Sequence, residues 1–355
     1  MKKQICLSLV FLLVLLTACS GSHRFLSGQV SDVRTEDGAI VSFVLTDEDG
    51  KRTGVLVPED AHFTSRVGAD AAEERALLLS GRPETSVHVE YNGGKTTLTT
   101  DSGEKLPAYT AWFIAVNGYL EPDAASLRDG TPLDLFHWTN GTTYRLKDGT
   151  ELLYERDPVG PENCIVAGQE SFEALSEAAQ QKVAAYFEER GLLYNVAEEL
   201  ERSYAFCRTR DPGGPVPGVW QDITPAASNE HVMYFLTEVD LPIHGDGTAT
   251  MERLCLSDVF DRETGARIET EDLFTCSREE AAQVLLDLVQ ITEQPLRSEM
   301  EAAFRLEYIT FSHSGVSVSF PGGSLPGFGC EYDDGLRDIL QPWAVPLKEP
   351  LADGK

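Results

Sequence analysis

Basic residues are scarce in this sequence, whose 355 residues contain 29 Lys and Arg against 58 Asp and Glu, a formal charge of −29. Nucleic acids and anionic lipid headgroups are bound mainly through Lys and Arg, so we expect neither as a partner. An acidic surface instead favours basic partners and accelerates their encounter at low salt. Excess carboxylate also confers solubility without any partner, and the composition leaves both interpretations open.

Motifs that carry catalysis are missing as well. The sequence has no Gly-x-Ser-x-Gly nucleophile turn and no His-Glu-x-x-His pair. It has no Cys-x-x-Cys pair, and none of its seven histidines is spaced near two cysteines, so we predict no metal site and no cofactor. Asp and Glu are so abundant that the sequence singles out no carboxylate pair for glycoside hydrolysis, which stays an alternative activity.

The first apolar run is short and follows two lysines. It extends from Ile5 to Leu16, which fits a secretory signal peptide and is too short for a comfortable membrane span. The run ends in Leu-Thr-Ala-Cys, residues 16–19, which resembles the lipobox of bacterial lipoproteins. That resemblance implies a diacylated Cys19 as the mature N-terminus, and thus a lipid anchor on the extracytoplasmic face of a bacterial membrane. An ordinary signal peptide or an anchor helix is the alternative.

Removal of residues 1–18 would delete two lysines and no acidic residue, which takes the formal charge from −29 to −31. Outside the membrane, the remaining cysteines allow two disulfides and one free thiol, and the sequence leaves their pairing open. An odd number favours at least one cysteine that is simply buried. These five residues are Cys164, Cys207, Cys255, Cys276 and Cys330.

Alternating apolar residues dominate the N-terminal part. They predict strands at residues 29–33, 39–45, 54–57, 86–91, 96–99 and 110–116, and a helix at 71–79. This order resembles an OB-fold barrel, so we predict an OB-like β domain over residues 28–118. OB folds often bind nucleic acids through aromatic and basic side chains, but few basic residues lie in these strands. Asp47-x-Asp49-Gly50 lacks the last glutamate of a calcium loop and therefore predicts a hairpin turn.

The middle of the chain, residues 119–210, is predicted to hold a hairpin at 143–154 and two helices. Apolar residues recur at helical spacing from Phe172 to Phe187, and Gly191 follows as a C-terminal cap. The second stripe runs over 192–204. We expect the charged runs at 188–190 and 198–202 to face solvent. The Pro- and Gly-rich residues 211–218 then predict either a linker or a surface loop.

The C-terminal part combines strands and helices. Strands are predicted at 231–239 and 251–261, and Ser277 begins a capping box for the helix that follows. A second helix at about 298–305 precedes a hairpin with strands at 306–311 and 316–320. We expect a short strand and a helix ending at Leu340 in the last segment.

Two stretches of this part, residues 255–274 and 311–320, resemble a known family. The first reads CLSDVFDRETG followed by TEDLF, and the second reads FSHSGVSVSF. They resemble the extracytoplasmic domain family found in the lysozyme-sensing anti-sigma factor RsiV and in many uncharacterised lipoproteins. The resemblance covers about residues 219–348 and implies an outward-facing α+β sensing or binding domain.

The chain also departs from that family. Where the family has a Gly-Gly-Ala-His-Gly loop, this sequence keeps only the step from His244 to Gly245. It has no cytoplasmic anti-sigma segment, so sigma-factor control is not transferred. In this loop, His244, Asp246 and Thr248 are our candidate ligand-binding residues, because an imidazole beside a carboxylate can also exchange protons. A polar turn between two strands is the alternative interpretation.

The sequence thus predicts an α+β protein: an N-terminal β-rich OB-like barrel followed by an α+β C-terminal domain. Its expected function is extracytoplasmic binding or sensing of a cell-envelope or basic protein ligand, without catalysis. The alternatives are a cell-wall or glycan hydrolase that uses unidentified Asp or Glu residues, and a purely structural envelope protein. The oligomeric state is left open. The predicted divisions are a signal peptide at 1–18, a tether at 19–27, and the segments 28–118, 119–210, 211–218 and 219–348.

Overall fold

The computed structural model describes residues 24–63, 71–210, 213–244, 249–321 and 325–347. They form a mixed α+β fold, as predicted, and most of its regular structure is β-sheet. The chain divides into two compact units. Unit 1 holds the described residues up to Ala125 together with Pro132–Asn140, and unit 2 holds Ser126–Thr131 and the described residues from Gly141 onward. Among these residues, no helix is both long and apolar enough to cross a membrane.

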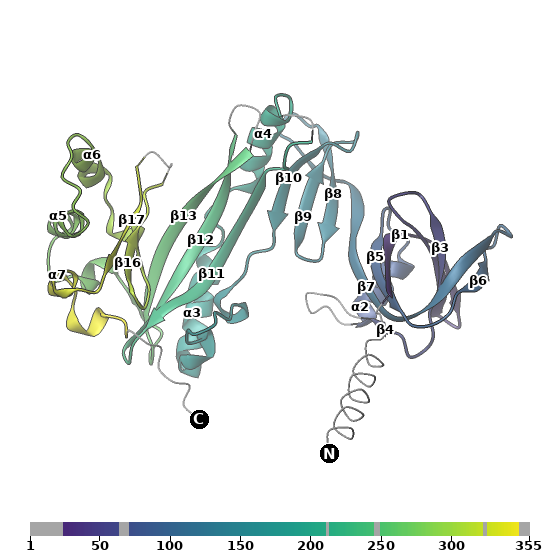
Figure 1. Ribbon diagram of the computed structural model, residues 1–355, viewed down its shortest axis with the longest axis horizontal. Coiled ribbons are helices and arrows are strands. Elements are labelled where there is room, and N and C mark those ends of the chain that lie inside the picture. Colours follow the sequence, from purple (N-terminus) through teal and green to yellow (C-terminus); the bar gives the residue numbers. More distant parts are fainter. Residues whose placement is uncertain (1–23, 64–70, 211–212, 245–248, 322–324, 348–355) are drawn as a thin grey trace, which may run out of the picture. The chain divides into compact units, whose positions relative to one another are not determined.

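Five strands of unit 1 close into a ring in the order β1–β2–β3–β7–β5, with β5 returning to β1 (Figure 1). The β3–β7 pairing is parallel and the other four are antiparallel. The ring strands are β1 (Arg24–Glu36), β2 (Ala39–Thr46), β3 (Arg52–Leu56), β5 (Ser86–Tyr91) and β7 (Lys105–Ser126). Three further strands pair with β7, namely β4 (His62–Phe63), β6 (Thr96–Thr99) and β8 (Pro132–Trp138).

The interior of the ring is apolar because its strands alternate. In β5, Val87 and Val89 are buried and their neighbours along the strand are not. Helix α2 (Ala71–Leu79), which matches the predicted helix, adds Leu78 to the same core. Each such side chain contributes roughly 1.5–3 kcal/mol on full burial. The predicted hairpin turn is confirmed, since Asp47 Oδ1 accepts hydrogen bonds from the backbone amides of Asp49 and Lys51.

Unit 2 is built on a twisted sheet with three long antiparallel strands at its centre (Figure 1). Strand β10 joins β11 in parallel, through Tyr154 paired with Gly218. The strands are β9 (Gly141–Arg145), β10 (Glu151–Arg156), β11 (Gly218–Ser228), β12 (Val232–His244), β13 (Ala249–Asp261) and β14 (Arg267–Ile268).

Strand β11 was not predicted, although it is central. It contains Pro225, and proline argues against a central strand because it cannot donate to the ladder. The structure accommodates Pro225 where the β11–β12 register shifts, between Pro225 and Ala227. Pro225 itself stands opposite Phe235, and the residue that the bulge leaves out of the ladder is Ala226.

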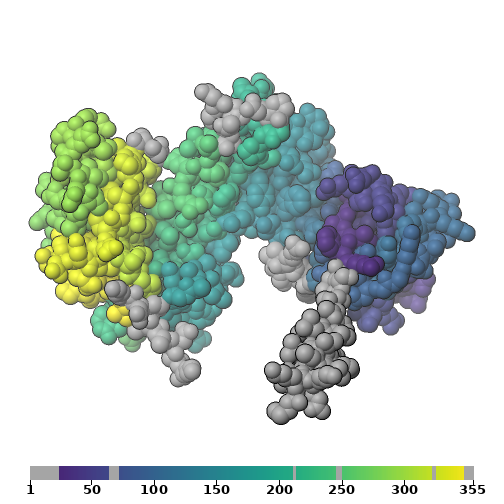
Figure 2. All heavy atoms as spheres, viewed as in Figure 1, coloured from purple at the N-terminus to yellow at the C-terminus, as the bar shows by residue number. Residues whose placement is uncertain are grey.

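Two layers cover the sheet of unit 2. Helix α3 packs Ala179, Val183 and Phe187 against Phe235 and Phe260 on one face. The other face is covered by a layer that packs around Tyr234 and contains the remaining C-terminal elements. Figure 2 shows the last described residues, in yellow, packed against the light-green helical segment. The helices are α3 (Glu177–Arg190), α4 (Val196–Cys207), α5 (Arg278–Leu288), α6 (Leu296–Ala303) and α7 (Asp334–Ile339), and the small sheet holds β15 (Ile309–Phe311), β16 (Gly315–Val318) and β17 (Phe328–Glu331).

The predicted helix ends are confirmed. The hydroxyl of Ser277 accepts from the Glu280 amide at the start of α5. Gly191 ends α3 with φ 66°, and its amide donates to Phe187 O. Single-turn 3-10 helices connect other elements at Pro161–Asn163, Phe172–Ala174, Thr270–Leu273, Leu306–Tyr308 and Pro342–Ala344.

Of the residues predicted to face solvent, Glu199 is buried and Arg190 is half-buried. Glu199 is 4% exposed, because it falls on the inner face of α4 beside Leu200 and Ser203. Arg190 forms an ion pair with Asp258 beneath α3. Helical spacing identifies the apolar face of a helix but does not show which charged neighbours on its margin have a buried partner.

The five cysteines of the described chain are all free thiols, so the structure contains neither of the two disulfides that the sequence allows. Cys330 is buried, and burial raises the pKa of its thiol to about 11. It matches the expectation of at least one cysteine that simply packs in the core.

Candidate functional site

The predicted loop residue His244 lies at the end of β12, packed against α4. Its Nε2 is 3.1 Å from Ser203 Oγ, and its ring contacts Phe206 edge-on at 5.0 Å. Burial is the larger cause that lowers the pKa of His244, and the positive charge of Arg202 is the smaller one. Ser203 is only 1% exposed. Asp246 and Thr248, the other two predicted residues, lie outside the described residues, as does Cys19.

Glu199 lies one helical turn before Ser203. Its Oε1 pairs with Arg202 at 2.8 Å, whereas its buried Oε2 has no hydrogen-bond partner within the described chain. Burial raises the pKa of this carboxyl. The structure thus pairs His244 with the buried Ser203, and the buried Glu199 lies one turn away on the same helix. No group of three or more His, Cys, Asp and Glu side chains in the described segments is arranged to hold a metal ion.

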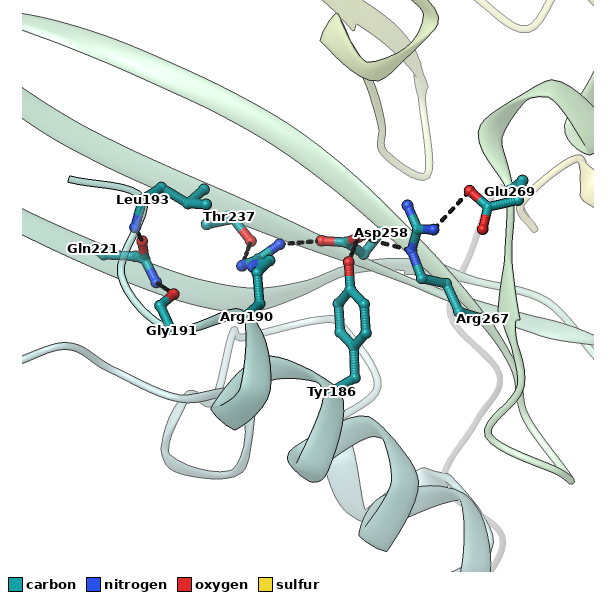
Figure 3. Close-up of polar contacts among 9 residues, drawn as sticks. All are labelled: Tyr186, Arg190, Gly191, Leu193, Gln221, Thr237, Asp258, Arg267 and Glu269. Atoms are coloured by element: carbon teal, nitrogen blue, oxygen red, sulfur yellow. Dashed lines mark hydrogen bonds and ion pairs between the residues drawn. The ribbon is translucent and has the colours of Figure 1, made fainter.

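A second polar cluster lies between α3 and the sheet (Figure 3). Asp258 accepts from Tyr186 at 2.8 Å and pairs with Arg190 and, at 3.4 Å, with Arg267. Arg190 also donates to Thr237 Oγ1 at 2.7 Å. Because both Asp258 oxygens are engaged, the cluster has no anionic group left for a ligand. We therefore interpret it as a connection that holds α3 on the sheet.

A polar pocket of about 580 Å³ lies in unit 2. Four parts of the chain line it: the loop before Phe172, the turn between β15 and β16, the end of β17 with the last turn of α7, and the C-terminal segment. Its lining residues are Gln169, Ser312, His313, Ser314, Glu331, Tyr332, Arg337 and Pro346.

Three side chains of this pocket carry a buried polar atom without a hydrogen-bond partner among the described residues: His313 through Nε2, Tyr332 through its hydroxyl, and Gln169 through Oε1. A buried polar atom left unpaired costs roughly 1–3 kcal/mol. Three of them around one pocket are therefore unexpected for a purely structural surface, since buried polar atoms are nearly always paired.

The neighbouring bonds determine what these atoms offer. His313 Nδ1 lies 2.9 Å from Leu347 O, and because a carbonyl only accepts, Nδ1 carries the proton. In the neutral ring, Nε2 is then an acceptor. Burial is the main cause that raises the pKa of the Tyr332 hydroxyl, and the nearby Tyr234 raises it further. The positive charge of Arg337 acts in the opposite direction. The phenol therefore stays protonated and able to donate.

Arg337 supplies the cationic group of the pocket. Its Nε donates to Tyr332 O at 3.2 Å, and its guanidinium lies over the Tyr332 ring at 5.8 Å. In the described part of the chain, neither Arg337 nor Glu331 forms an ion pair. Both charges are exposed and lie at the pocket.

Buried contacts hold the walls of the pocket in place. Glu170, next to Gln169, pairs with Arg262 and accepts from Ser228 Oγ at 2.6 Å. On the opposite wall, Asn229 donates to the carbonyls of Trp343 and Val345, at 2.8 and 2.9 Å. These contacts join the C-terminal segment and the Gln169 loop to the end of β11.

Sequence reasoning did not identify this pocket. It assigned His313 to a hairpin turn and gave Gln169, Tyr332 and Arg337 no role. The turn itself is confirmed, between β15 and β16. These residues come from segments that are far apart in the sequence, and no spacing signal connects them.

No protein-family model and no curated protein matches this chain in sequence. A DUF3298 family protein from Pseudomonas aeruginosa PAO1 is similar in structure, with 11% identity and a TM-score of 0.31 over 64% of this chain and 94% of that chain. A member of the same family from Bacteroides fragilis NCTC 9343 has 11% identity and a TM-score of 0.33, over 63% and 95%. Likeness at this level indicates neither a shared ligand nor a shared activity.

Proposed function

We propose that this chain is a lipid-anchored extracytoplasmic protein that binds or senses a ligand, without catalysis, through the pocket of unit 2. The observation that carries this proposal is the set of three unpartnered polar atoms, on His313, Tyr332 and Gln169. Concave sites with a few convergent polar groups are the usual form of small-molecule sites. In the free protein these unpaired atoms are destabilising, and a ligand that forms hydrogen bonds with them would remove this free-energy cost.

We further infer that unit 1 is an OB-like barrel. Its closed five-stranded ring, the parallel β3–β7 pairing and the position of α2 between β3 and β5 support this inference. The proposed C-terminal domain is of the RsiV type, on the basis of residues 255–274 and 311–320 alone. Of these stretches, the second includes the pocket residues Ser312, His313 and Ser314.

The proposed ligand belongs to the cell envelope or is a basic protein. The low number of basic residues supports a basic protein as the ligand, since a mature chain of formal charge −31 attracts cations at long range. This attraction is screened within about 8 Å at physiological salt, so it speeds encounter more than it provides specificity. The pocket, rather than the net charge, would therefore determine which ligand is retained.

The test is a pull-down with the purified full chain against peptidoglycan, lysozyme and envelope extract, at low and moderate salt. We expect one component to be retained at moderate salt. Arg337→Gln should reduce its retention, because the substitution removes the charge at the pocket. The matched control is Arg278→Gln, which removes a charge at the exposed first residue of α5, away from the pocket.

The contrary result is a component that is retained only at low salt, and equally by Arg337→Gln. This result would show non-specific electrostatic binding by the acidic surface and would contradict the proposal. Degradation of a component would favour the alternative, a cell-wall or glycan hydrolase. The described carboxyls whose pKa burial raises most clearly, Glu74 and Glu199, are 2% and 4% exposed. A hydrolase would therefore need other carboxylates or a rearrangement that exposes these two.

A further inference from the structure

The hydrogen-bonding groups of the pocket define a ligand class, and this inference rests on the proposed function. We propose that the pocket binds a neutral carbohydrate, a short saccharide whose hydroxyl groups pair with His313, Gln169, Tyr332 and Arg337.

Two of the unpartnered atoms are acceptors. His313 Nε2 is an acceptor because Nδ1 donates to Leu347 O, and Gln169 Oε1 is a carbonyl oxygen. Both need a donor from the ligand. Carboxylates and fully ionised phosphates carry only acceptors and would leave both atoms unpaired. An anionic ligand is therefore a poor match for this part of the pocket, although Arg337 would attract it.

Two other groups need an acceptor. The Tyr332 hydroxyl is protonated and buried, and Arg337 presents terminal guanidinium N–H groups that no carboxylate pairs in the described structure. An ammonium group carries donors alone, so it has nothing to offer the guanidinium and is repelled by it. A cationic side chain would be attracted by Glu331 and could donate to the two acceptors. The positive charge of Arg337 would repel it.

A hydroxyl group both donates and accepts, so a polyhydroxyl ligand fits every group of the set. The formal charges at the pocket, one Arg337 and one Glu331, cancel, which suits a ligand without net charge. Ser312 and Ser314 also line the pocket; the Ser312 hydroxyl already donates to Gly315 O at 2.9 Å, and Ser314 Oγ lies 3.2 Å from Ser312 Oγ. The volume, about 580 Å³, lies within the range of roughly 300–1,000 Å³ that small-molecule sites occupy.

Isothermal titration calorimetry of the full chain tests this assignment, in a detergent without a sugar headgroup. The probes are a panel of neutral disaccharides of glucose, galactose, mannose and N-acetylglucosamine, with lysine amide and inorganic phosphate as charged probes. We expect saturable binding of at least one disaccharide and none of the charged probes. Tyr332→Phe should weaken that binding about tenfold, the loss of roughly one hydrogen bond. Gln169→Met, which removes the acceptor and keeps an unbranched side chain, should act similarly.

The matched control is Tyr194→Phe, which removes a phenol hydroxyl outside the pocket, one that lies 3.5 Å from Glu155. It should bind the disaccharide as the unsubstituted chain does. Binding of lysine amide or phosphate alone, lost in Tyr332→Phe, would overturn the carbohydrate class and leave the binding function standing. A disaccharide that binds equally to Tyr332→Phe and Gln169→Met would place the site elsewhere. If no probe binds and no envelope component is retained, both the ligand class and the proposed function are wrong.

Discussion

The imidazole Nδ1 of His313 lies 2.9 Å from the backbone carbonyl oxygen of Leu347. This one contact joins the turn after β15 to the C-terminal segment, and it decides which ring nitrogen carries the proton. It also turns Nε2 into a buried acceptor without a partner in the described structure. A contact that looks structural therefore determines which hydrogen-bonding group the pocket offers.

The ion pairs of the buried Asp258 with two partly exposed arginines predict a loss of stability on substitution. Asp258→Asn removes the anion that Arg190 and Arg267 share and leaves two cations without it. We expect the free energy of unfolding to fall by about 3–5 kcal/mol, measured by urea denaturation. Asp287→Asn is the control, since Asp287 is 69% exposed in its pair with Arg297 and should cost less than about 1 kcal/mol. Equal losses in the two variants would contradict a buried, cooperative cluster.

Glu74 predicts a pH dependence of unit 1. Both of its side-chain oxygens are buried, and burial raises its pKa from 4.5 to about 7 although the backbone of Val116 opposes this shift. The folded chain thus holds a proton that the unfolded chain loses above pH 4.5. The associated stability is full below pH 4.5 and is lost as the pH rises through 7, by on the order of 2 kcal/mol.

Glu74→Gln should remove this dependence and stabilise the protein at pH 8, because the neutral amide need not ionise. The measurement is urea denaturation at several pH values between 4.5 and 8. The exposed neighbour Glu73 provides the control substitution, Glu73→Gln, which should leave the pH profile unchanged. A profile that is the same in Glu74→Gln and in the unsubstituted chain would show that Glu74 is ionised in the folded state.

Local signals in the sequence predicted much of this fold. The helix at residues 71–79 has the predicted bounds, and Ser277 and Gly191 bound their helices as expected. Each of these depends on a pattern within a few residues, either a capping side chain or a left-handed glycine. Strand β11 was not predicted. It contains Pro225, which argues locally against a central strand, and the β11–β12 register shifts directly after this residue.

The candidate site was not predictable in the same way. His244 was chosen for its neighbour Asp246, but its structural partner is Ser203 on α4, 41 residues away. The pocket residues Gln169 and Arg337 are further apart still, and no alternation or helical period relates them. What identifies the pocket is the lack of partners for buried atoms, and this property exists only once the chain is folded.

The predicted lipid anchor has a direct test of its own. Cys19→Ser should abolish the diacylglycerol mass on the mature chain and release the protein from the membrane fraction, because the cysteine thiol is the proposed acceptor. Intact-mass spectrometry and membrane fractionation measure the two effects. Cys6→Ser, within the predicted signal peptide, should leave both unchanged. An unsubstituted chain without the lipid mass would contradict the resemblance to lipoproteins.

The most direct test of the account pairs two measurements on Tyr332→Phe: the melting temperature without ligand, and retention of a peptidoglycan digest at moderate salt. Because the Tyr332 hydroxyl is buried and unpaired in the free protein, its removal should raise the melting temperature. The same change should weaken retention about tenfold, since it removes the hydrogen bond that the hydroxyl would donate to the ligand. A lower melting temperature with unchanged retention would show that the hydroxyl has a structural partner, and would contradict a binding role for this pocket.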